Sequence, residues 1–293
     1  MKVYDAFLFN DELELLKLRL QLLGDVVEQF IIVESKRTLA GEKKPLHFLD
    51  NQNLFQQYLH KIKHVEVAVN DLSSWEYEFF QRNAIKEGLQ QCNDDDIIFI
   101  SDADEIINIP EVLKFQNKFP ALVELPMYYY YANLKTNVTF FVNLVGRWSF
   151  IKHLDLGFRY RDYQKYTSSI IGCRDVTTGW HFSYLFGTNV EKYQQKIRSF
   201  SHQEYNTPYF LNSNRIEKCV RFGIDLFERP FMKLNMDNAS INPLRPYLYQ
   251  LSFDVYYKKP QVVEYFHLSN IFFLLRKSWY GKLKYYFRNK RAE

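Results

Sequence analysis

The first 118 residues alternate between short apolar runs and helical patterns, and this alternation limits the fold more than any other feature. Short runs rich in β-branched and aromatic residues predict strands, and apolar residues at helical spacing predict helices. Strands in regular alternation with helices predict an α/β fold, a doubly wound and mostly parallel sheet with flanking helices. The expected strands are residues 3–9, 26–33, 64–69 and 97–100, and the expected helices are residues 13–23, 75–91 and 111–118.

The pattern changes after Pro120. Aromatic strands are expected at residues 122–131 and 145–153, followed by helices at residues 190–200 and 215–227. Pro243, Pro246 and Pro260 then break up the rest of the chain. We therefore predict a main domain over residues 1–235 and a small C-terminal appendage over residues 236–293.

The first helix carries recognisable end signals. Asp11 followed three residues later by Glu14 is the spacing of a capping box at the start of a helix. Gly24 follows Leu23, where a glycine typically ends a helix.

The net charge of +4 is unevenly distributed. Residues 276–293 hold seven basic residues and one acid, which leaves the rest of the chain at about −2. A slightly acidic domain offers no extended phosphate-binding face, so we expect no nucleic-acid partner. The tail mixes cations with aromatic and apolar side chains, which predicts peripheral contact with an anionic membrane. A solvated basic end, or an arm packed on the domain, are the alternatives.

The cysteines and the N-terminus indicate a cellular compartment. Cys92, Cys173 and Cys219 are few and widely spaced, which argues against a disulfide framework. The first residues carry acids where a signal peptide needs an apolar run. We expect a cytoplasmic protein, with a possible peripheral position on the inner face of the membrane.

An acidic cluster follows the apolar strand at residues 97–100. Asp102 and Asp104 are spaced so that both can supply hard oxygen ligands, which Mg²⁺ and Mn²⁺ prefer. A cation bound there would neutralise charge on a diphosphate leaving group. Acids at such a place also cap helices, and Glu105 fits either a supporting role or a cap. The position after a buried strand favours the metal interpretation.

At this point the sequence resembles glycosyltransferase family 17, over about residues 3–230. The resemblance rests on several separated motifs that occur in the family's order. They are the stretch from Phe9 to Phe48, ISDADEI at residues 100–106, GWHFSYLFG at residues 179–187, SFSHQEYN at residues 199–206, and RIEKCVRFGIDLFERP at residues 215–230.

The resemblance implies a GT-A fold, a UDP-sugar donor, Mn²⁺ or Mg²⁺, and inversion at the anomeric carbon. The expected enzyme is a metal-dependent transferase that moves N-acetylglucosamine from UDP-N-acetylglucosamine to a hydroxyl of a glycan or lipid-linked glycan. One alternative is the same fold with another nucleotide sugar, acting in bacterial lipopolysaccharide or capsule synthesis. The other is a non-catalytic protein that binds carbohydrate or membrane.

Four residues are expected around the donor besides the acidic cluster. His181, in the GWHFSY motif, fits the late histidine that GT-A enzymes supply as a metal ligand, against the alternative of a core histidine. Glu34 and Ser35 end the second strand at the ligand-binding edge of the sheet, although a simple turn explains them equally. Together with Asp102, Arg82 is expected to bind the nucleotide sugar, as a fork-shaped donor on its helix. A solvated helix face is the alternative for Arg82.

The acceptor hydroxyl needs a general base. Glu204 and then Asp225 are the expected catalytic carboxylates, and Asp155 is a further possibility. Glu204 also suits a structural pairing with His202 or Arg198. Aromatic residues of the same motifs can stack on a sugar, but core packing is expected more often for each; these are Trp180, Tyr184 and Tyr205.

Overall fold

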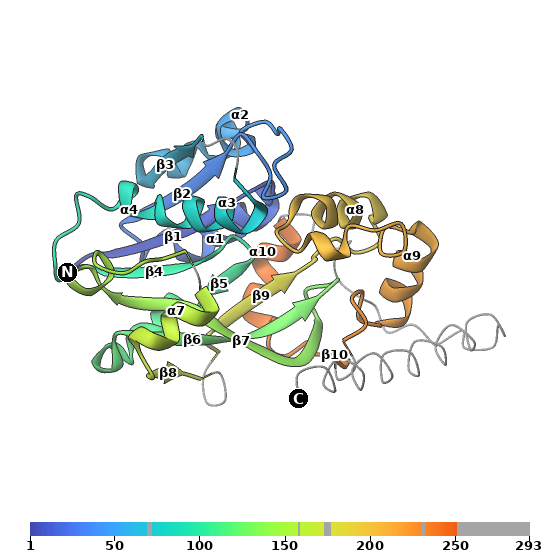
Figure 1. Ribbon diagram of the computed structural model, residues 1–293. Helices are drawn as coiled ribbons and strands as arrows, with labels where there is room; N and C mark the ends of the chain where they lie inside the picture. The colour runs from blue at the N-terminus through green and yellow to red at the C-terminus, as the bar shows by residue number, and fades with distance from the viewer. Residues whose placement is uncertain (69–71, 158, 173–176, 230–231, 251–293) are drawn as a thin grey trace, which may run out of the picture.

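The computed structural model describes residues 1–68, 72–157, 159–172, 177–229 and 232–250. Within these ranges a ten-stranded mixed sheet forms the centre of the molecule, with helices on both sides (Figure 1). The α/β class and the flanking helices were therefore predicted correctly. The main path of the sheet has the order β3-β2-β1-β4-β7-β6-β9-β5, while β10 pairs with β7 and β8 pairs with β6.

The first four strands are parallel neighbours and match the predicted alternation closely. They are β1 (Val3–Phe9), β2 (Gln29–Ser35), β3 (Ile62–Val67) and β4 (Ile97–Asp102). The later strands add both antiparallel and parallel pairs. They are β5 (Glu105–Ile107), β6 (Ala121–Tyr129), β7 (Leu134–Arg147), β8 (Ile170–Ile171), β9 (Gly179–Ser183) and β10 (Leu234–Met236).

The helices are mostly short. The α-helices are α1 (Leu13–Leu23), α2 (His47–Asp50), α3 (Ser74–Asn83), α4 (Ile85–Gly88), α5 (Ile109–Leu113), α6 (Trp148–Ile151), α7 (Arg159–Tyr166), α8 (Val190–Ser199), α9 (Ser213–Phe222) and α10 (Arg245–Gln250). The 3₁₀ helices are η1 (Gln52–Lys61), η2 (Gln116–Lys118), η3 (Gln203–Tyr205) and η4 (Asn242–Leu244).

Several predicted boundaries are wrong, and the helix expected over residues 111–118 is α5 followed by the separate η2. The helix expected over residues 75–91 divides at Ala84 into α3 and α4. The strand expected over residues 145–153 ends at Arg147, because the next two backbone N–H groups donate to carbonyls of Asp96 and Asp94 and the chain turns into α6. The helix expected over residues 215–227 ends at Phe222, where Gly223 takes a left-handed conformation with φ of 62°.

The predicted bounds of α1 are correct, but its caps differ from the expected ones. Glu12 is the residue before the helix, and no side chain caps its first turn. The carboxylate of Glu12 instead accepts the backbone N–H groups of Asn10 and Asp11, each at 3.1 Å. Gly24 keeps right-handed helical angles, with φ of −59°. The capping box predicted from Asp11 and Glu14 is therefore absent, and Glu12 bonds to the backbone before the helix.

Side chains alternate between the two faces of the parallel strands. Phe7 and Phe99 belong to one apolar cluster, which includes α1 and reaches Leu244 and Leu248. Ala6, Ile98 and Ile100 belong to the cluster on the other face, beneath α4 and α6. Both faces of these strands are therefore buried, as in other parallel sheets.

A third apolar cluster lies to one side of the sheet, around α8 and α9, which lie side by side (Figure 1). It is rich in tyrosine, including Tyr129, Tyr130 and Tyr193. Further along the chain, β10 pairs with β7, and Ile241, Leu244 and Leu248 join the main core. The described part of the predicted appendage thus packs on the domain, while the boundary at residue 235 stays a prediction.

The order in which strands are added to the sheet changes direction between β1 and β4. The strands β2 and β3 extend from one side of β1, and β4 then returns to the other side. Such a switch point leaves a crevice beyond the carboxyl ends of the two strands, where ligands bind in α/β proteins. Asp102 ends β4 in this crevice, and Glu12 lies just beyond the end of β1.

Two sequence predictions concern the rest of the chain. Among the described residues, no helix is both long and apolar enough to cross a bilayer. Residues 276–293, the predicted membrane-contacting tail, lie outside the described residues. Cys92 and Cys219 are free thiols, and Cys173 lies outside the described residues.

Candidate active site

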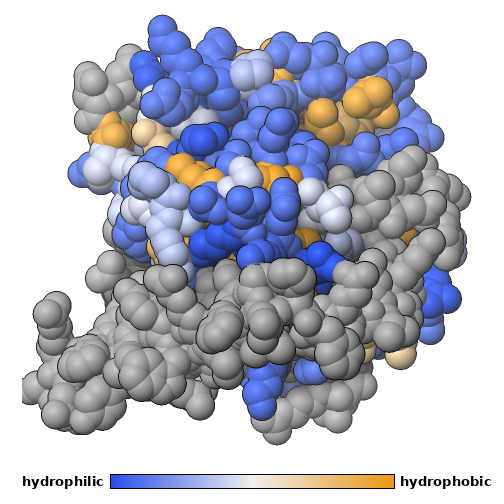
Figure 2. Space-filling view, turned by 90° about the vertical axis from the view of Figure 1, so that its right-hand side faces the viewer, coloured by the Kyte–Doolittle hydropathy of each residue, from blue (hydrophilic) through white to orange (hydrophobic). Residues whose placement is uncertain are grey.

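A cavity of about 1030 Å³ opens at the switch point of the sheet. Its lining is strongly charged in both senses. The cationic side chains are Arg37, Lys44, Arg82, Arg159, Lys196 and Arg229, and the acidic side chains are Glu12, Glu78, Asp102, Asp104 and Glu105. The space-filling view shows a largely hydrophilic face with a few separate hydrophobic patches (Figure 2).

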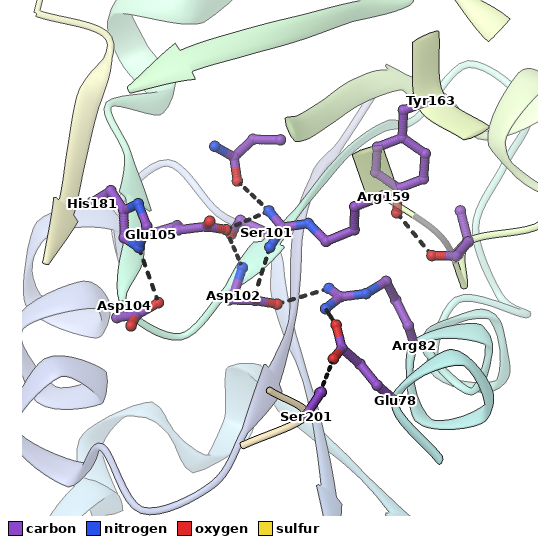
Figure 3. A network of polar contacts seen from close by, with 12 residues as sticks. Glu78, Arg82, Ser101, Asp102, Asp104, Glu105, Arg159, Tyr163, His181 and Ser201 are labelled. Atoms are coloured by element: carbon purple, nitrogen blue, oxygen red, sulfur yellow. Dashed lines mark hydrogen bonds and ion pairs between the residues drawn. The ribbon is translucent and has the colours of Figure 1, made fainter. Parts of the chain in front are cut away.

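Asp102 is held by two arginines. Arg82 of α3 donates from Nη1 to Oδ1 at 2.7 Å, and Arg159 of α7 donates from Nη1 to Oδ2 at 2.6 Å (Figure 3). Partial burial alone would raise the pKa of Asp102, but the two guanidinium groups outweigh it and hold that pKa below its usual value. Asp102 is therefore a carboxylate with both oxygens already paired.

Local sequence explains how Arg82 reaches Asp102. Ser73 and Glu76 form a capping box that starts α3, so the direction of the helix is fixed at its first turn. Arg82 lies near the end of this helix and is buried, at 1% exposure. Its second Nη atom pairs with Glu78 one turn earlier at 3.1 Å.

Arg159 ties the acidic turn to β7. Its Nη2 atom donates to Glu105, and also to the amide oxygen of Asn143 at 2.9 Å. Glu105 in turn accepts the backbone N–H of Asp102 at 2.7 Å. A hydrogen bond between Asp102 and Glu105 thus stabilises the turn that joins β4 to β5, and Arg159 binds both of these side chains.

A buried ion pair supports this turn from beneath. Arg19 of α1 donates two hydrogen bonds to Asp5 of β1, and both side chains are fully buried. The same guanidinium donates to the hydroxyl of Ser101 and to the backbone carbonyls of Asp102 and Glu105. The backbone of the acidic turn is therefore fixed by α1.

Asp104 has a different environment from Asp102. Lys196 of α8 donates to its Oδ2 at 2.8 Å. Its Oδ1 lies 3.9 Å from Nε2 of His181 (Figure 3). His181 lies on β9 opposite Glu105, because β5 and β9 pair in antiparallel register. Its other ring nitrogen, Nδ1, is buried and has no hydrogen-bond partner among the described residues. One oxygen of Asp104 and one histidine nitrogen therefore face each other in the cavity.

The pKa values of Asp104 and Lys196 reflect their contacts. Burial would raise the pKa of Asp104, but Lys196 and His181 outweigh it and lower that pKa. Burial would lower the pKa of Lys196, but Asp104 and Glu12 outweigh it and raise that pKa. Asp104 is thus an anion and Lys196 a cation at neutral pH.

We tested whether these residues fit a divalent ion. Ligand atoms bound to one such ion at roughly 2.1 Å lie about 3 to 4 Å apart, depending on the angle between them. The 3.9 Å between Asp104 and His181 falls within this range. Asp102 does not face the pair in the same way, since its oxygens bond to arginines. Among the described residues, no three His, Cys, Asp or Glu side chains are arranged to hold a metal. Only the spacing of Asp104 and His181 matches two ligands of one ion, and metal binding by Asp102, Asp104 and His181 stays a prediction.

Other residues predicted for the donor site lie outside the cavity lining. Glu34 is fully buried, and it accepts the backbone N–H of Phe48 at 3.0 Å and contacts Nε2 of His64 at 3.1 Å. Ser35 is also buried and bonds to the hydroxyl of Tyr77. The structure brings Arg82, Asp102, Asp104 and His181 together and leaves these two apart, and a nucleotide contact for them stays a prediction.

The predicted bases also lie outside the lining. Glu204 is exposed and pairs with Nδ1 of His202 at 2.8 Å, and His202 itself lines the cavity. Asp225 is buried, at 3% exposure, and accepts three hydrogen bonds from Arg229. Asp155 is exposed and accepts from the side chain of Asn83 and the backbone of Gly157.

The aromatic candidates divide in the same way. Trp180 is buried in the main core, and its ring N–H donates to the carbonyl of Ser240. Tyr184 and Tyr205 both line the cavity. Core packing therefore explains Trp180, and sugar stacking is left open for the two tyrosines.

Three lining residues were not recognised from the sequence. Arg159 and Lys196 come from α7 and α8, more than 50 and 90 positions from their acidic partners in the turn. Glu12 lay inside the stretch that carried the family resemblance, but its sequence context resembled a helix start. Its pKa is raised to about 7 by burial and by the neighbouring carboxylate of Asp11.

A charged cavity at the switch point of a doubly wound sheet is the arrangement in which α/β proteins bind nucleotides and other anionic ligands. The chain belongs to glycosyltransferase family 17, since residues 1–231 match the model of that family. The predicted family is therefore confirmed.

Two curated relatives carry the name β-1,4-mannosyl-glycoprotein 4-β-N-acetylglucosaminyltransferase. The proteins of Rattus norvegicus and Homo sapiens are each 31% identical to this chain over 115 residues, or 36% of it. The aligned region is 21% of the rat protein and 22% of the human one, so the match spans about a fifth of their length.

A solved structure, that of mannose-6-phosphate isomerase from Helicobacter pylori, aligns with 51% of this chain and 72% of its own. The identity is 11% and the TM-score is 0.30, which is too low for any argument about fold or function.

Proposed function

We propose that this chain is an inverting glycosyltransferase of GT-A type that transfers N-acetylglucosamine from UDP-N-acetylglucosamine to a hydroxyl of a glycan acceptor, with Mn²⁺ or Mg²⁺ as cofactor. One observation carries the proposal. Asp104 and His181 face each other at the end of the central strand β4, in a cavity that also presents Arg82, Arg159 and Lys196. Membership of the family and the names of the two relatives support the choice of N-acetylglucosamine as the transferred sugar.

The cations of the cavity suit a diphosphate leaving group. A departing UDP gains negative charge, and preorganised positive groups stabilise that charge best when little water surrounds them. Arg82 is buried and Arg159 is nearly so, with 10% of its side chain exposed. Both already hold Asp102, so their guanidinium planes are fixed before a donor arrives.

Asp104 and His181 are the residues that would hold the divalent ion. The ion, when bound, supplies positive charge to the oxygens of the diphosphate. Lys196 leaves Oδ1 of Asp104 directed toward His181, because it bonds to Oδ2. Lys196 is thus a positioning residue for this carboxylate.

The acceptor hydroxyl requires a base that reaches it inside the cavity. Among the nominated carboxylates, Glu204 and Asp225 do not line the cavity; Glu204 pairs with His202, and Asp225 accepts three hydrogen bonds from Arg229. Glu12 lines the cavity, and its pKa of about 7 suits a base that works near neutral pH. We therefore place Glu12 ahead of Glu204 and Asp225 as the base.

The test is hydrolysis of the donor with and without Mn²⁺, comparing UDP-N-acetylglucosamine with UDP-galactose and UDP-glucose. We expect UDP release that depends on the metal and is fastest with UDP-N-acetylglucosamine. A preference for another sugar would favour the alternative of a lipopolysaccharide or capsule transferase with the same fold. No hydrolysis and no transfer with any donor would favour the non-catalytic alternative and refute the proposal.

We also propose that residues 276–293 give the cytoplasmic protein peripheral contact with an anionic membrane, where a lipid-linked acceptor would be presented. The support is sequence alone, seven cations among aromatic residues. Removal of these residues is expected to release the protein from vesicles of phosphatidylglycerol and phosphatidylcholine. Unchanged sedimentation with the vesicles would contradict the contact.

A further inference from the structure

Helix α3 presents a graded row of side chains to the cavity. Trp75, Glu78, Gln81 and Arg82 all line it. Arg82 has 1% of its surface exposed and binds Asp102, whereas Trp75 has 46% of its surface exposed. An α-helix rises about 1.5 Å per residue, so the two lie roughly 10 Å apart along its axis. The row therefore leads from the buried charged end of the cavity to its solvent-facing rim.

The segment after α8 closes over this rim. The hydroxyl of Ser201 bonds to Glu78, which joins the segment to the middle of α3. The ring of His202 meets the indole of Trp75 at a centroid distance of 4.9 Å and an angle of 90°. Phe200 and Tyr205 contact the other sides of the imidazole, at 5.7 and 6.2 Å. Trp75 and His202 thus form a rigid corner that aromatic packing and the bonded Glu78 hold in place.

The chemistry of this corner is mixed. Trp75 offers a wide apolar surface, while Glu204 contacts the imidazole through Nδ1 at 2.8 Å and leaves the carboxylate near the rim. A pyranose ring has an apolar C–H face and an edge of hydroxyl groups, so it matches an aromatic surface beside polar groups. Binding is favourable when such a ring covers a large exposed indole, because apolar surface is removed from water.

We propose that Trp75 and His202 form an acceptor subsite, in which a saccharide ring of the glycan acceptor stacks on the indole at the cavity rim. The inference rests on the proposed function, because it places the acceptor on the solvent side of the donor. The buried end, with Arg82 and Arg159, holds the nucleotide sugar, and the acceptor approaches along α3.

The experiment compares Trp75→Ala and Trp75→Phe with Phe80→Ala in the full chain. Phe80 lies on the same helix with a similar exposure of 44%, but it does not line the cavity. Two rates are measured with UDP-N-acetylglucosamine and Mn²⁺: transfer to the disaccharide mannosyl-β-1,4-N-acetylglucosamine, and hydrolysis by water. The protein is also applied to a printed array of glycans ending in mannose, galactose, glucose or N-acetylglucosamine.

In Trp75→Ala we expect the ratio of transfer to hydrolysis to fall about tenfold, mainly through a higher acceptor KM. Trp75→Phe recovers most of the ratio, because a smaller aromatic face remains, and Phe80→Ala keeps it. The array spots bound by the wild type lose signal in Trp75→Ala.

Equal losses of transfer and hydrolysis in Trp75→Ala would show that the indole supports the donor site or the fold, and would overturn the subsite. An unchanged ratio with unchanged array binding, or a wild type that binds no glycan and transfers to none, would overturn it as well. Loss of array signal in Trp75→Ala from a wild type that hydrolyses no nucleotide sugar would keep the subsite and reject the proposed transferase.

Discussion

Asp102 and Asp104 are two residues apart, yet the structure gives them different surroundings. Asp102 has both oxygens bonded to arginines, while Asp104 keeps one oxygen toward His181 and gives the other to Lys196. The difference arises because Asp102 points toward α3 and α7, whereas Asp104 points toward β9 and α8. Paired acids at such a spacing are therefore not equivalent ligands, and each is best judged by its own partners.

The largest effect is expected from Asp104→Ala. This variant removes the oxygen that faces His181, and we expect metal-dependent turnover to fall by at least about 100-fold. Metal affinity should fall, which is measured as a rise in the Mn²⁺ concentration needed for half-maximal donor hydrolysis. Glu111→Ala, which breaks only an exposed pair with Lys114, is the matched control and should keep wild-type activity. Full activity in Asp104→Ala would contradict the proposal that Asp104 has a role in the site that Asp102 does not have.

A second test addresses the arginine side of the comparison. Arg159→Ala leaves Glu105, which is 1% exposed, without its cationic partner, and we expect a loss of about 2 kcal/mol in the free energy of unfolding. The KM for the donor should also rise. Arg159→Lys should recover part of the stability but little of the donor binding, because an ammonium lacks the fork that joins Asp102, Glu105 and Asn143. Chemical denaturation and donor titration measure the two quantities.

The third prediction concerns Glu12 and the pH dependence of transfer. Its raised pKa of about 7 means that the carboxylate form grows as pH rises through 7, so transfer should increase over that range. Glu12→Gln should remove this limb and lower transfer at pH 8 by about tenfold or more. Folding disfavours the charged form of Glu12, because its pKa rises from the ordinary 4.5 to about 7. The wild-type protein therefore loses stability as the pH rises through this range. Above pH 7, Glu12→Gln should have a higher free energy of unfolding than the wild type. A variant with lower stability at pH 8 would contradict the burial of this carboxylate.

The smallest effect is expected from Glu204→Gln. Its carboxylate is exposed and does not line the cavity, so transfer should change by no more than about twofold. A loss as large as that of Glu12→Gln, with the same change in pH profile, would make Glu204 the base instead.

The sequence predicted the parts of the site that depend on one strand. An apolar run that ends in Asp102 and Asp104 is enough to place these residues at the carboxyl edge of a sheet, and β4 confirms it. The helix that carries Arg82 was also foreseen, although its end was not. His181 came only through the family resemblance, since its approach to Asp104 depends on the pairing of β5 with β9.

Other parts could not be predicted, because they depend on contacts between distant segments. Nothing near Arg159 or Lys196 in the sequence marks them as partners of the acidic turn. Glu12 was not nominated from the sequence, because its burial beside Asp11 and Lys196 depends on how distant segments pack. Glu34 and Ser35 ended a strand as expected, but their side chains turned toward neighbours within the domain.

The guanidinium of Arg19 has a consequence for how the chain folds. It contacts Asp5, Ser101 and the carbonyls of Asp102 and Glu105 at once, so the acidic turn obtains its shape from a helix more than 80 positions earlier. Folding of the second half of the chain alone would leave this turn without its template. Helix α1 is in this sense a structural support for the acidic turn. A cut in the chain between α1 and β4 would preserve the shape of the turn only while the two fragments stay associated.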